Sequence, residues 1–367
     1  MTWLAWRQLR ASALVAALAV AGIVVLLAVT GSHLLHVYDT VVAPCAARHG
    51  GAFSPACHAV TANFFTLGHL RHVFSALLLV APFLAGIFWG APLVARELEA
   101  GTYRLAWTQS VTRLRWITTR IVLVSLATVV LTVALSWAVT WWEWPIDHLL
   151  SSGAFSNFDE RDVVPVAYAL CAVALGALVG AVTRRSIVAM ASTLVGLLGV
   201  RYLVASYVRP NLLAPLQQSR HFRAPSVNGN SIGYRITPPN PADWVLSDQV
   251  VAPTGKVIGQ YGGIGPNGSF GFNVANNGTA SFTGVGPCPN RVPVPPGGIR
   301  AHATPAQAHA AQAAIQHCVN SFHLREVLTY QPTSHYWPLQ WSEAAIFVAL
   351  AVAFGAACVG WVRRRLS

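Results

Sequence analysis

Histidine pairs are the first residues in this sequence whose spacing could support chemistry. His33 and His36 lie three residues apart, with Asp39 close behind, and His69 and His72 repeat the spacing. A zinc site needs three or four ligands from His, Cys and acidic side chains, and neither pair is completed at a recognised spacing. The chain also has no H-E-x-x-H and no G-x-S-x-G motif. We therefore predict no metal site and no catalytic residue, so the chain is not expected to be an enzyme.

The glycine-rich segments do not form a nucleotide site either. A phosphate-binding loop needs a G-x-x-x-x-G-K-[ST] run, and Gly255-Lys256 lacks both the leading glycine and the following Ser or Thr. We therefore expect no ATPase site and no cofactor in this chain.

The composition places most of the chain in a membrane. Of 367 residues, 54% are hydrophobic and only 10% are charged, against roughly 25% charged in soluble proteins. A bilayer core of about 30 Å takes about 20 apolar residues in a helix. Six stretches qualify, at 11–30, 73–94, 117–141, 163–182, 186–208 and 342–361. This pattern excludes a soluble enzyme and a disordered protein, and it predicts a multi-pass protein of the plasma membrane.

Arginine positions set the expected orientation of these spans, because cytoplasmic loops carry an excess of basic residues. The segments on one side of the six spans hold 12 of the 24 basic residues, namely Arg7, Arg10, Arg96, Arg104, Arg113, Arg115, Arg120, Arg184, Arg185 and Arg363 to Arg365. The opposite loops at 31–72 and 142–162 hold only Arg48, Arg71 and Arg161. Both termini are therefore predicted to be cytoplasmic. The net charge of +12 reflects this arrangement, and nucleic-acid binding is not expected.

Arg201 is the ionisable residue that lies well inside a predicted span, about two-thirds of the way along 186–208. An arginine in a membrane is costly, so it should pair, extend toward the interface or line a cavity. The first two alternatives give Arg201 a structural role, and the third places it beside a possible substrate path. A proton-coupled transporter is disfavoured because no acidic residue lies at the centre of a span.

Four of the six cysteines fall in predicted outside segments. Cys45 and Cys57 share one loop, and Cys288 and Cys318 share the large polar segment near the end of the chain. An oxidising exterior favours disulfides. We predict the pairs Cys45–Cys57 and Cys288–Cys318, with four free thiols as the alternative.

The segment 209–340 is the substantial polar part of the chain. Short apolar runs at 256–258, 269–274 and 279–285 lie among Gly, Asn and Pro, which is typical of small strands joined by turns. Pro305 then begins an alanine-rich stretch with the composition of a helix. We predict a small α+β extracellular domain inserted between spans five and six.

The expected fold class is therefore a mainly α membrane protein with six transmembrane helices and this insert. Residues 1–208 would contain spans one to five, with a cytoplasmic loop at 95–116. Residues 341–367 would form span six and a basic cytoplasmic tail. Two G-x-x-x-G motifs, Gly86/Gly90 and Gly176/Gly180, allow close helix approach, within this bundle or at a seam with another subunit, and we favour the bundle.

The loop between spans two and three is the most informative segment. Glu97 and Glu99 are the acidic residues of the predicted cytoplasmic part, so a basic partner would find its anionic contacts there. Gly101 is placed to end the helix, because glycine adopts the left-handed conformation at low cost.

Thr102 can cap a short helix over 103–108 that presents Tyr103, Arg104 and Trp107 to the cytosol. The alternative is a solvated loop whose Trp and Arg side chains anchor at the lipid surface.

These residues resemble a family. The run Glu97-x-Glu99-Ala100-Gly101-Thr102, followed by Thr108 and Val111-Thr112-Arg113, resembles the E-x-E-x-G-T … [ST]-P-V-[ST]-R coupling loop of type-two ABC exporter permeases. The stretch FWGAPLVARELEAGTYRLAWTQSVTR is similar to an uncharacterised actinobacterial branch. The chain departs from the pattern at Gln109-Ser110, which replaces the usual proline, and in the size of its insert.

The resemblance implies the permease subunit of an ATP-driven exporter, whose loop docks into a groove of a separate cytosolic ABC ATPase. It also implies a second permease, either another copy of this chain in a homodimer, which we favour, or a similar chain. The implied coupling residues are Arg96, Glu97, Glu99, Gly101, Thr102, Tyr103, Arg104, Trp107 and Arg113.

The low charge of the spans favours an amphipathic or lipid-like cargo, which would leave the cell across the seam between the two permeases, with membrane lipid as a further partner of the spans. The alternative function is a membrane-anchored extracellular binding or sensing protein without transport activity. One or two spans would suffice for such an anchor, so six argue against it.

Overall fold

The computed structural model divides the chain into two compact units. The helical unit comprises Met1–Leu212 and Tyr336–Ser367, and the inserted unit comprises Leu213–His335. Residues 209–212 and 336–340, which the sequence analysis assigned to the insert, therefore belong to the helical unit. The structure describes residues 2–49, 51–52, 54–67, 70–101, 112–150, 154–222, 226–228, 231–233, 238–261, 272–274, 279–282, 286–289 and 305–365.

The helical unit contains six helical segments long and apolar enough to cross a membrane, counted over the described residues. This confirms the six predicted spans. The helices that form the predicted spans are α1 (Thr2–Val37), α4 (Arg71–Ala85), α5 (Ala91–Ala100), α7 (Arg113–Leu150), α8 (Val164–Thr183), α9 (Ser186–Leu203) and α11 (Tyr336–Arg365). Two short helices, α2 (Ala43–Arg48) and α3 (His58–Leu67), follow α1.

One span is interrupted by a wider turn. A π-helical turn at Gly86–Gly90 joins α4 to α5, so that together they make the second span. Pro82 lies inside α4 and has no N–H to donate to the preceding turn. Similar π-helical turns follow α1 at Tyr38–Val42 and α9 at Val204–Val208.

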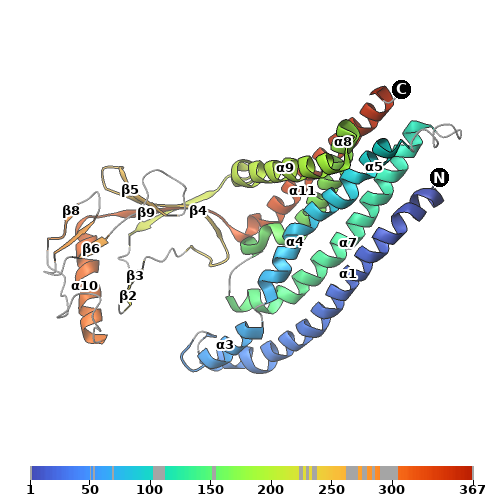
Figure 1. Ribbon diagram of the computed structural model, residues 1–367. Coiled ribbons are helices and arrows are strands. Elements are labelled where there is room, and N and C mark those ends of the chain that lie inside the picture. Colours follow the sequence, from blue (N-terminus) through green and yellow to red (C-terminus); the bar gives the residue numbers. More distant parts are fainter. Residues whose placement is uncertain are drawn as a thin grey trace. The chain divides into compact units, whose positions relative to one another are not determined.

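Helix α8 is central to this unit and contacts α4, α5, α7, α9 and α11, while α1 packs on α7. In the most apolar stretch of the span that contains α8, 72% of the residues are buried inside the protein. In the corresponding stretch of the span that contains α1, 6% are buried. The first residues of α1 and the last residues of α11 lie at the same end of the unit as the end of α5 (Figure 1). We call this the termini end.

The two G-x-x-x-G motifs meet in one seam between the second and fourth spans. A Cβ atom added to Gly86 would lie 2.9 Å from the Cβ of Ala172, and one added to Gly176 would lie 2.6 Å from the backbone N of Ala91. Side chains cannot fit at these distances, so glycine is required for the backbones to approach. The motifs therefore serve packing within the bundle, as we had favoured.

The structure joins both predicted cysteine pairs. The Cα atoms are 5.9 Å apart in Cys45–Cys57 and 5.4 Å apart in Cys288–Cys318, within the range usual for disulfides. The first bond lies in the segment that follows α1, and the second ties a strand region of the inserted unit to its helix, α10 (Pro305–Ser321).

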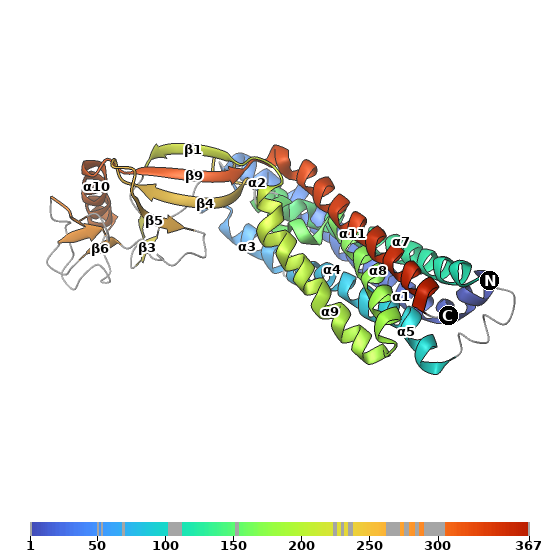
Figure 2. The same ribbon diagram turned by 90° about the horizontal axis from the view of Figure 1, so that it is seen from above.

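The inserted unit is built on a four-stranded antiparallel sheet in the order β1 (Leu216–His221), β9 (Arg325–Gln331), β4 (Trp244–Val251) and β5 (Val257–Tyr261). Figure 2 shows β1, β9 and β4 side by side. Smaller antiparallel pairings join β2 (Ser226–Asn228) to β3 (Ser231–Gly233), and β6 (Phe272–Val274) to β7 (Ala280–Phe282) and β8 (Gly286–Pro287). Its core contains Phe222 and Val250 together with Ile315 and Val319 of α10.

Candidate coupling site and a buried charged layer

The end of α5 forms the described part of the predicted coupling site. Gly101 follows the last residue of α5 with a φ of 71°, which is the left-handed conformation predicted from the sequence. α7 begins at Arg113. Thr102, Tyr103, Arg104 and Trp107 lie outside the described residues, so the short helix over 103–108 stays a prediction.

Glu97 ties α5 to α7. Its Oε1 lies 2.5 Å from Nη1 of Arg120, and both side chains are largely removed from solvent. The Arg120 guanidinium also lies 4.8 Å from the ring centroid of Trp116, one turn earlier in α7. A salt bridge and a cation–π contact of this kind hold the arginine in one position. The two helices that flank the predicted coupling segment are thus joined by an ion pair.

Glu99 ties α5 to α9. Its Oε2 accepts hydrogen bonds from the backbone N–H of Ser186, at 3.1 Å, and from the Ser186 hydroxyl, at 2.7 Å. Ser186 is the first residue of α9, and a carboxylate there satisfies a free N–H and complements the positive end of the helix dipole. Glu99 therefore acts as a cap for a helix other than its own.

The structure thus gives both carboxylates partners inside the chain, where the sequence analysis expected them to be contacts for another protein. Arg96, which directly precedes Glu97 in α5, is exposed. Among the predicted coupling residues that the structure describes, Glu97, Glu99 and Gly101 come together at the end of one helix. This arrangement connects α5, α7 and α9 at the termini end.

The opposite end of the helical unit holds a layer of charged side chains. Six of the chain's 12 acidic residues lie there with four arginines, although the whole sequence is only 10% charged. We call these residues the charged layer: Arg71, Glu143, Asp147, Asp159, Glu160, Arg161, Asp162, Arg201, Arg209 and Glu343.

One part of the charged layer joins α4, α7 and the segment before α8. Glu143 is only 1% exposed, and its carboxylate lies 3.2 Å from Nη2 of Arg161 and 3.6 Å from Nε of Arg71. Asp147, one turn later, lies 2.7 Å from Arg161 and 3.1 Å from Arg71. Two arginines therefore bridge two carboxylates of α7.

A second part, which we call the clamp, consists of Asp159, Tyr168, Arg209 and Glu343. Nε and Nη2 of Arg209 donate to the two carboxylate oxygens of Glu343 at 2.6 and 2.8 Å. The Tyr168 hydroxyl donates to Glu343 at 2.5 Å, and Asp159 also accepts from Arg209. Because Glu343 is 0% exposed, this two-point pairing is what compensates its charge.

Arg201 lies beside the clamp. Its Nη2 is 3.4 Å from Asp159, its Nη1 donates to the carbonyl of Leu79, and its guanidinium lies 4.9 Å from the ring centroid of Tyr168. Pairing is therefore the alternative that the structure shows for this residue. Apart from Arg201, the residues of the charged layer were not predicted from the sequence to form a site. The available signal was the five acidic residues between 143 and 162 in a chain with so few charges.

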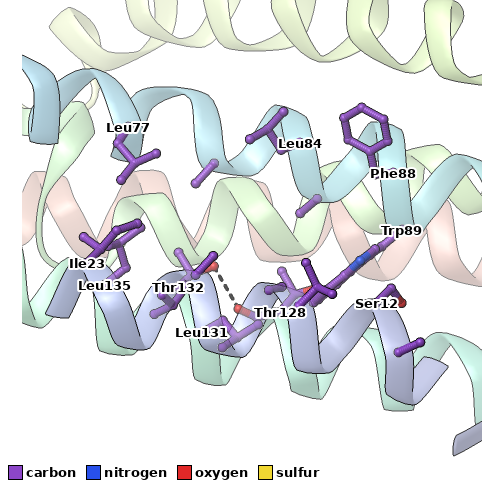
Figure 3. A pocket seen from close by; sticks show the side chains of 17 residues that line it. Ser12, Ile23, Leu77, Leu84, Phe88, Trp89, Thr128, Leu131, Thr132 and Leu135 are labelled. Carbon is purple, nitrogen blue, oxygen red and sulfur yellow. Dashed lines mark hydrogen bonds between the residues drawn. The ribbon is translucent and has the colours of Figure 1, made fainter. Parts of the chain in front are cut away.

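An apolar cavity of about 610 Å³ lies between α1, α4, the turn at Gly86–Gly90 and α7. Figure 3 shows side chains from these elements, including Ile23, Leu84, Phe88 and Leu135. Thr128 and Thr132 supply polar atoms to its wall, and no charged side chain is among the described residues that line it. The volume falls in the range of about 300–1,000 Å³ typical of small-molecule sites, and the lining suits an apolar group.

No group of three or more His, Cys, Asp or Glu side chains that could hold a metal ion occurs within the described ranges. A chain with six membrane-length helical segments, four of them packed against the one that contains α8, is a multi-pass membrane protein. The family model described as ABC-2 membrane transporter related matches residues 16–209, more than half of the chain. The chain therefore belongs to this family of ABC-type permeases. Neither a search of curated proteins nor a search of solved structures found a match.

Proposed function

We propose that this chain is the permease subunit of an ATP-driven exporter, working with a separate cytosolic ATPase that binds ATP and Mg²⁺. The chain itself would carry no ATPase site and no cofactor. The ATPase would dock at the segment between α5 and α7, and two copies of the permease would face each other. Membership of the ABC-2 family supports an ATPase partner in general.

The observation that carries this proposal is the pair of contacts Glu97–Arg120 and Glu99–Ser186 at the termini end, which we call the three-helix tie. A partner that pushes on the segment between α5 and α7 would act on α5 and α7 through Glu97–Arg120, and on α9 through Glu99–Ser186. Salt bridges and helix caps of this kind make the three helix ends move together. A membrane anchor for a sensing domain has no need of such a connection.

The apolar cavity supports an amphipathic or lipid-like cargo. Its wall is formed by three membrane-spanning segments, and few polar atoms line it. Lipid tails are as apolar as a protein interior, so an apolar group prefers a protein site to lipid only if the site fits its shape. The cavity offers such a shaped site within the spans.

We propose a plasma-membrane location with both termini cytoplasmic and the inserted unit extracellular. Cysteines introduced at Arg185 and at Lys256 would then differ in intact cells. Both positions are exposed, one between α8 and α9 and the other between β4 and β5. An impermeant maleimide should label Lys256→Cys and leave Arg185→Cys unlabelled until the cells are permeabilised. Labelling of Arg185→Cys in intact cells would reverse the orientation.

The test of the function is to purify the tagged chain in mild detergent from its native host and to identify its partners. We expect a stoichiometric ATPase whose hydrolysis depends on this chain. In that complex, Glu97→Arg should lower the permease-stimulated ATPase rate about 10-fold, because like charges would meet at Arg120, and this corresponds to about 1.4 kcal/mol. The double variant with Arg120→Glu should restore most of the rate.

Arg363→Glu serves as the matched control, since it reverses an exposed charge at the same end of the unit without touching the tie. It should leave the rate within about twofold of the parent. A chain that purifies without a nucleotide-dependent partner would contradict the proposed function. A double variant as inactive as Glu97→Arg would contradict the role of the ion pair in coupling.

A further inference from the structure

A second cavity, of about 370 Å³, lies inside the charged layer between α4 and the 3₁₀ turn at Ala154–Glu160. Its wall combines the polar side chains of Ser75, Ser156, Asn157 and Glu160 with the apolar Ala76 and Leu79. The volume is large enough for a small organic molecule. It differs from the apolar cavity because charged groups line it.

The charged layer has an excess of negative charge. It contains six carboxylates and four arginines, and the two carboxylates without an arginine within ion-pair distance are Asp162 and Glu160. Asp162 accepts a hydrogen bond from the Tyr336 hydroxyl. Glu160 is half-buried, is hydrogen-bonded to Ser75 and is attracted by the charge of Arg201, but no ion pair within 4.0 Å joins it to a Lys, Arg or His of the described residues. A cation in the cavity would add a direct partner for this carboxylate.

The neutral polar groups of the cavity also favour a hydrogen-bond donor. The Ser75 hydroxyl donates to Glu143 at 2.9 Å, and Nδ2 of Asn157 donates to the same carboxylate at 3.0 Å. What remains on these two side chains is acceptor capacity, the Ser75 oxygen lone pairs and the Asn157 carbonyl. With Glu160 they present a set of acceptors.

Two basic side chains also line the cavity and oppose a cation. The guanidinium of Arg71 is held by Asp147 at 3.1 Å and by Glu143 at 3.6 Å, which offsets its charge. His72 is exposed, and the surrounding high-dielectric solvent weakens its effect on a cation in the cavity.

We propose that this cavity binds the primary ammonium group of an organic molecule. Three N–H donors match the acceptors of Glu160, Ser75 and Asn157, while Ala76 and Leu79 contact the carbon chain. A calcium site would need six to eight oxygen ligands, more than the one carboxylate and the three neutral polar side chains of this cavity supply. A quaternary ammonium is recognised by aromatic faces, and no Phe, Tyr or Trp is among the described residues that line the cavity.

This inference rests on the proposed function and deepens it, because an exporter whose outward cavity takes an ammonium group would carry an amine-bearing amphipath. Binding can nevertheless be measured on the purified full chain without any ATPase. Failure of binding would therefore be distinguishable from failure of the exporter assignment.

The experiment is isothermal titration of the full chain in detergent with hexylamine, hexyltrimethylammonium and hexanol. Hexylamine should bind saturably with one site per chain. Hexyltrimethylammonium has the charge without N–H donors, and hexanol has a donor without the charge, so both should bind at least about 10-fold more weakly, the effect of losing hydrogen bonds to a charged group. This comparison needs no mutation.

The variant Glu160→Gln keeps the size of the side chain and removes its charge, and it should also weaken hexylamine binding about 10-fold. Asp39→Asn is the matched control, because Asp39 is an exposed carboxylate outside the charged layer, and it should leave binding unchanged. Equal binding of hexylamine and hexyltrimethylammonium, retained binding in Glu160→Gln, or displacement of hexylamine by millimolar Ca²⁺ would each overturn the proposal.

Discussion

Replacement of Arg209 by Ala should lower the free energy of unfolding of the helical unit by about 3–5 kcal/mol, the usual cost of removing one partner from a buried ion pair. Glu343 is 0% exposed and would lose both hydrogen bonds that now come from the guanidinium. Asp159 would lose a partner as well. The measurement is thermal or denaturant unfolding of the purified chain in detergent, followed by circular dichroism.

Two further variants separate the clamp from a general effect of losing an arginine. Arg363→Ala removes an exposed arginine of α11 and should change the free energy of unfolding by no more than about 0.5 kcal/mol. Arg209→Met combined with Glu343→Leu removes both charges and should recover most of the loss, because buried pairs are often replaceable by apolar residues. A double variant no more stable than Arg209→Ala would show that Glu343 is not the source of the cost.

The position of the clamp in the chain gives it a second consequence. Arg209 lies just before Leu213, where the inserted unit begins, and Glu343 lies in the first turns of α11, just after that unit ends. The two chain connections to the inserted unit are therefore fixed to each other and to α8 by Tyr168. If α8, α9 or α11 moves during transport, the movement must either carry the other two helices along or break these contacts.

The six spans could be predicted from sequence because lipid imposes a strict condition on the chain. A segment in the bilayer must satisfy every backbone group internally and must be apolar for about 20 residues. The helices then extend beyond the predicted spans, for example from 117–141 to Arg113–Leu150, because water at the interface tolerates polar helix ends.

The charged layer and the three-helix tie could not be read from sequence in the same way. Glu143 and Arg71 are 72 residues apart, and Glu99 and Ser186 are 87 residues apart. Such pairs depend on how the helices are arranged, and hydropathy carries no information about partners. The composition could show only that acidic residues gather near the ends of spans three and four.

Three strands of the main sheet of the inserted unit, β1, β4 and β9, were missed for a different reason. The predicted runs at 256–258, 269–274 and 279–285 fall on or beside β5, β6 and β7, which are short. The longer β9 places Glu326 and Gln331 at buried positions, where Arg220 donates to Glu326 at 2.8 and 2.7 Å and Gln331 donates to the carbonyl of Leu213. Polar residues at inward positions break the apolar alternation by which a strand is recognised.

Gly180→Leu should prevent stable packing of the second span on α8. A Cβ at this position would meet the carbonyl oxygen of Ala91 at less than contact distance, and backbone atoms cannot rotate away as a flexible side chain can. Overpacking of a tight core costs about 1–3 kcal/mol and at times more, and here a whole side chain must enter between two backbones. We expect little of the variant to accumulate as a folded protein, measured by fluorescence-detected size exclusion from solubilised membranes.

The milder Gly180→Ala should accumulate and should unfold at a lower temperature than the parent, which keeps the prediction measurable if the leucine variant does not fold. Gly355→Leu and Gly355→Ala are the matched controls, since an added Cβ at Gly355 of α11 meets no atom within 4 Å. There the removal of glycine from a helix interior should stabilise by up to about 1 kcal/mol. Equal effects at the two glycines would mean that the close approach of α8 to the second span does not depend on the absence of a side chain at Gly180.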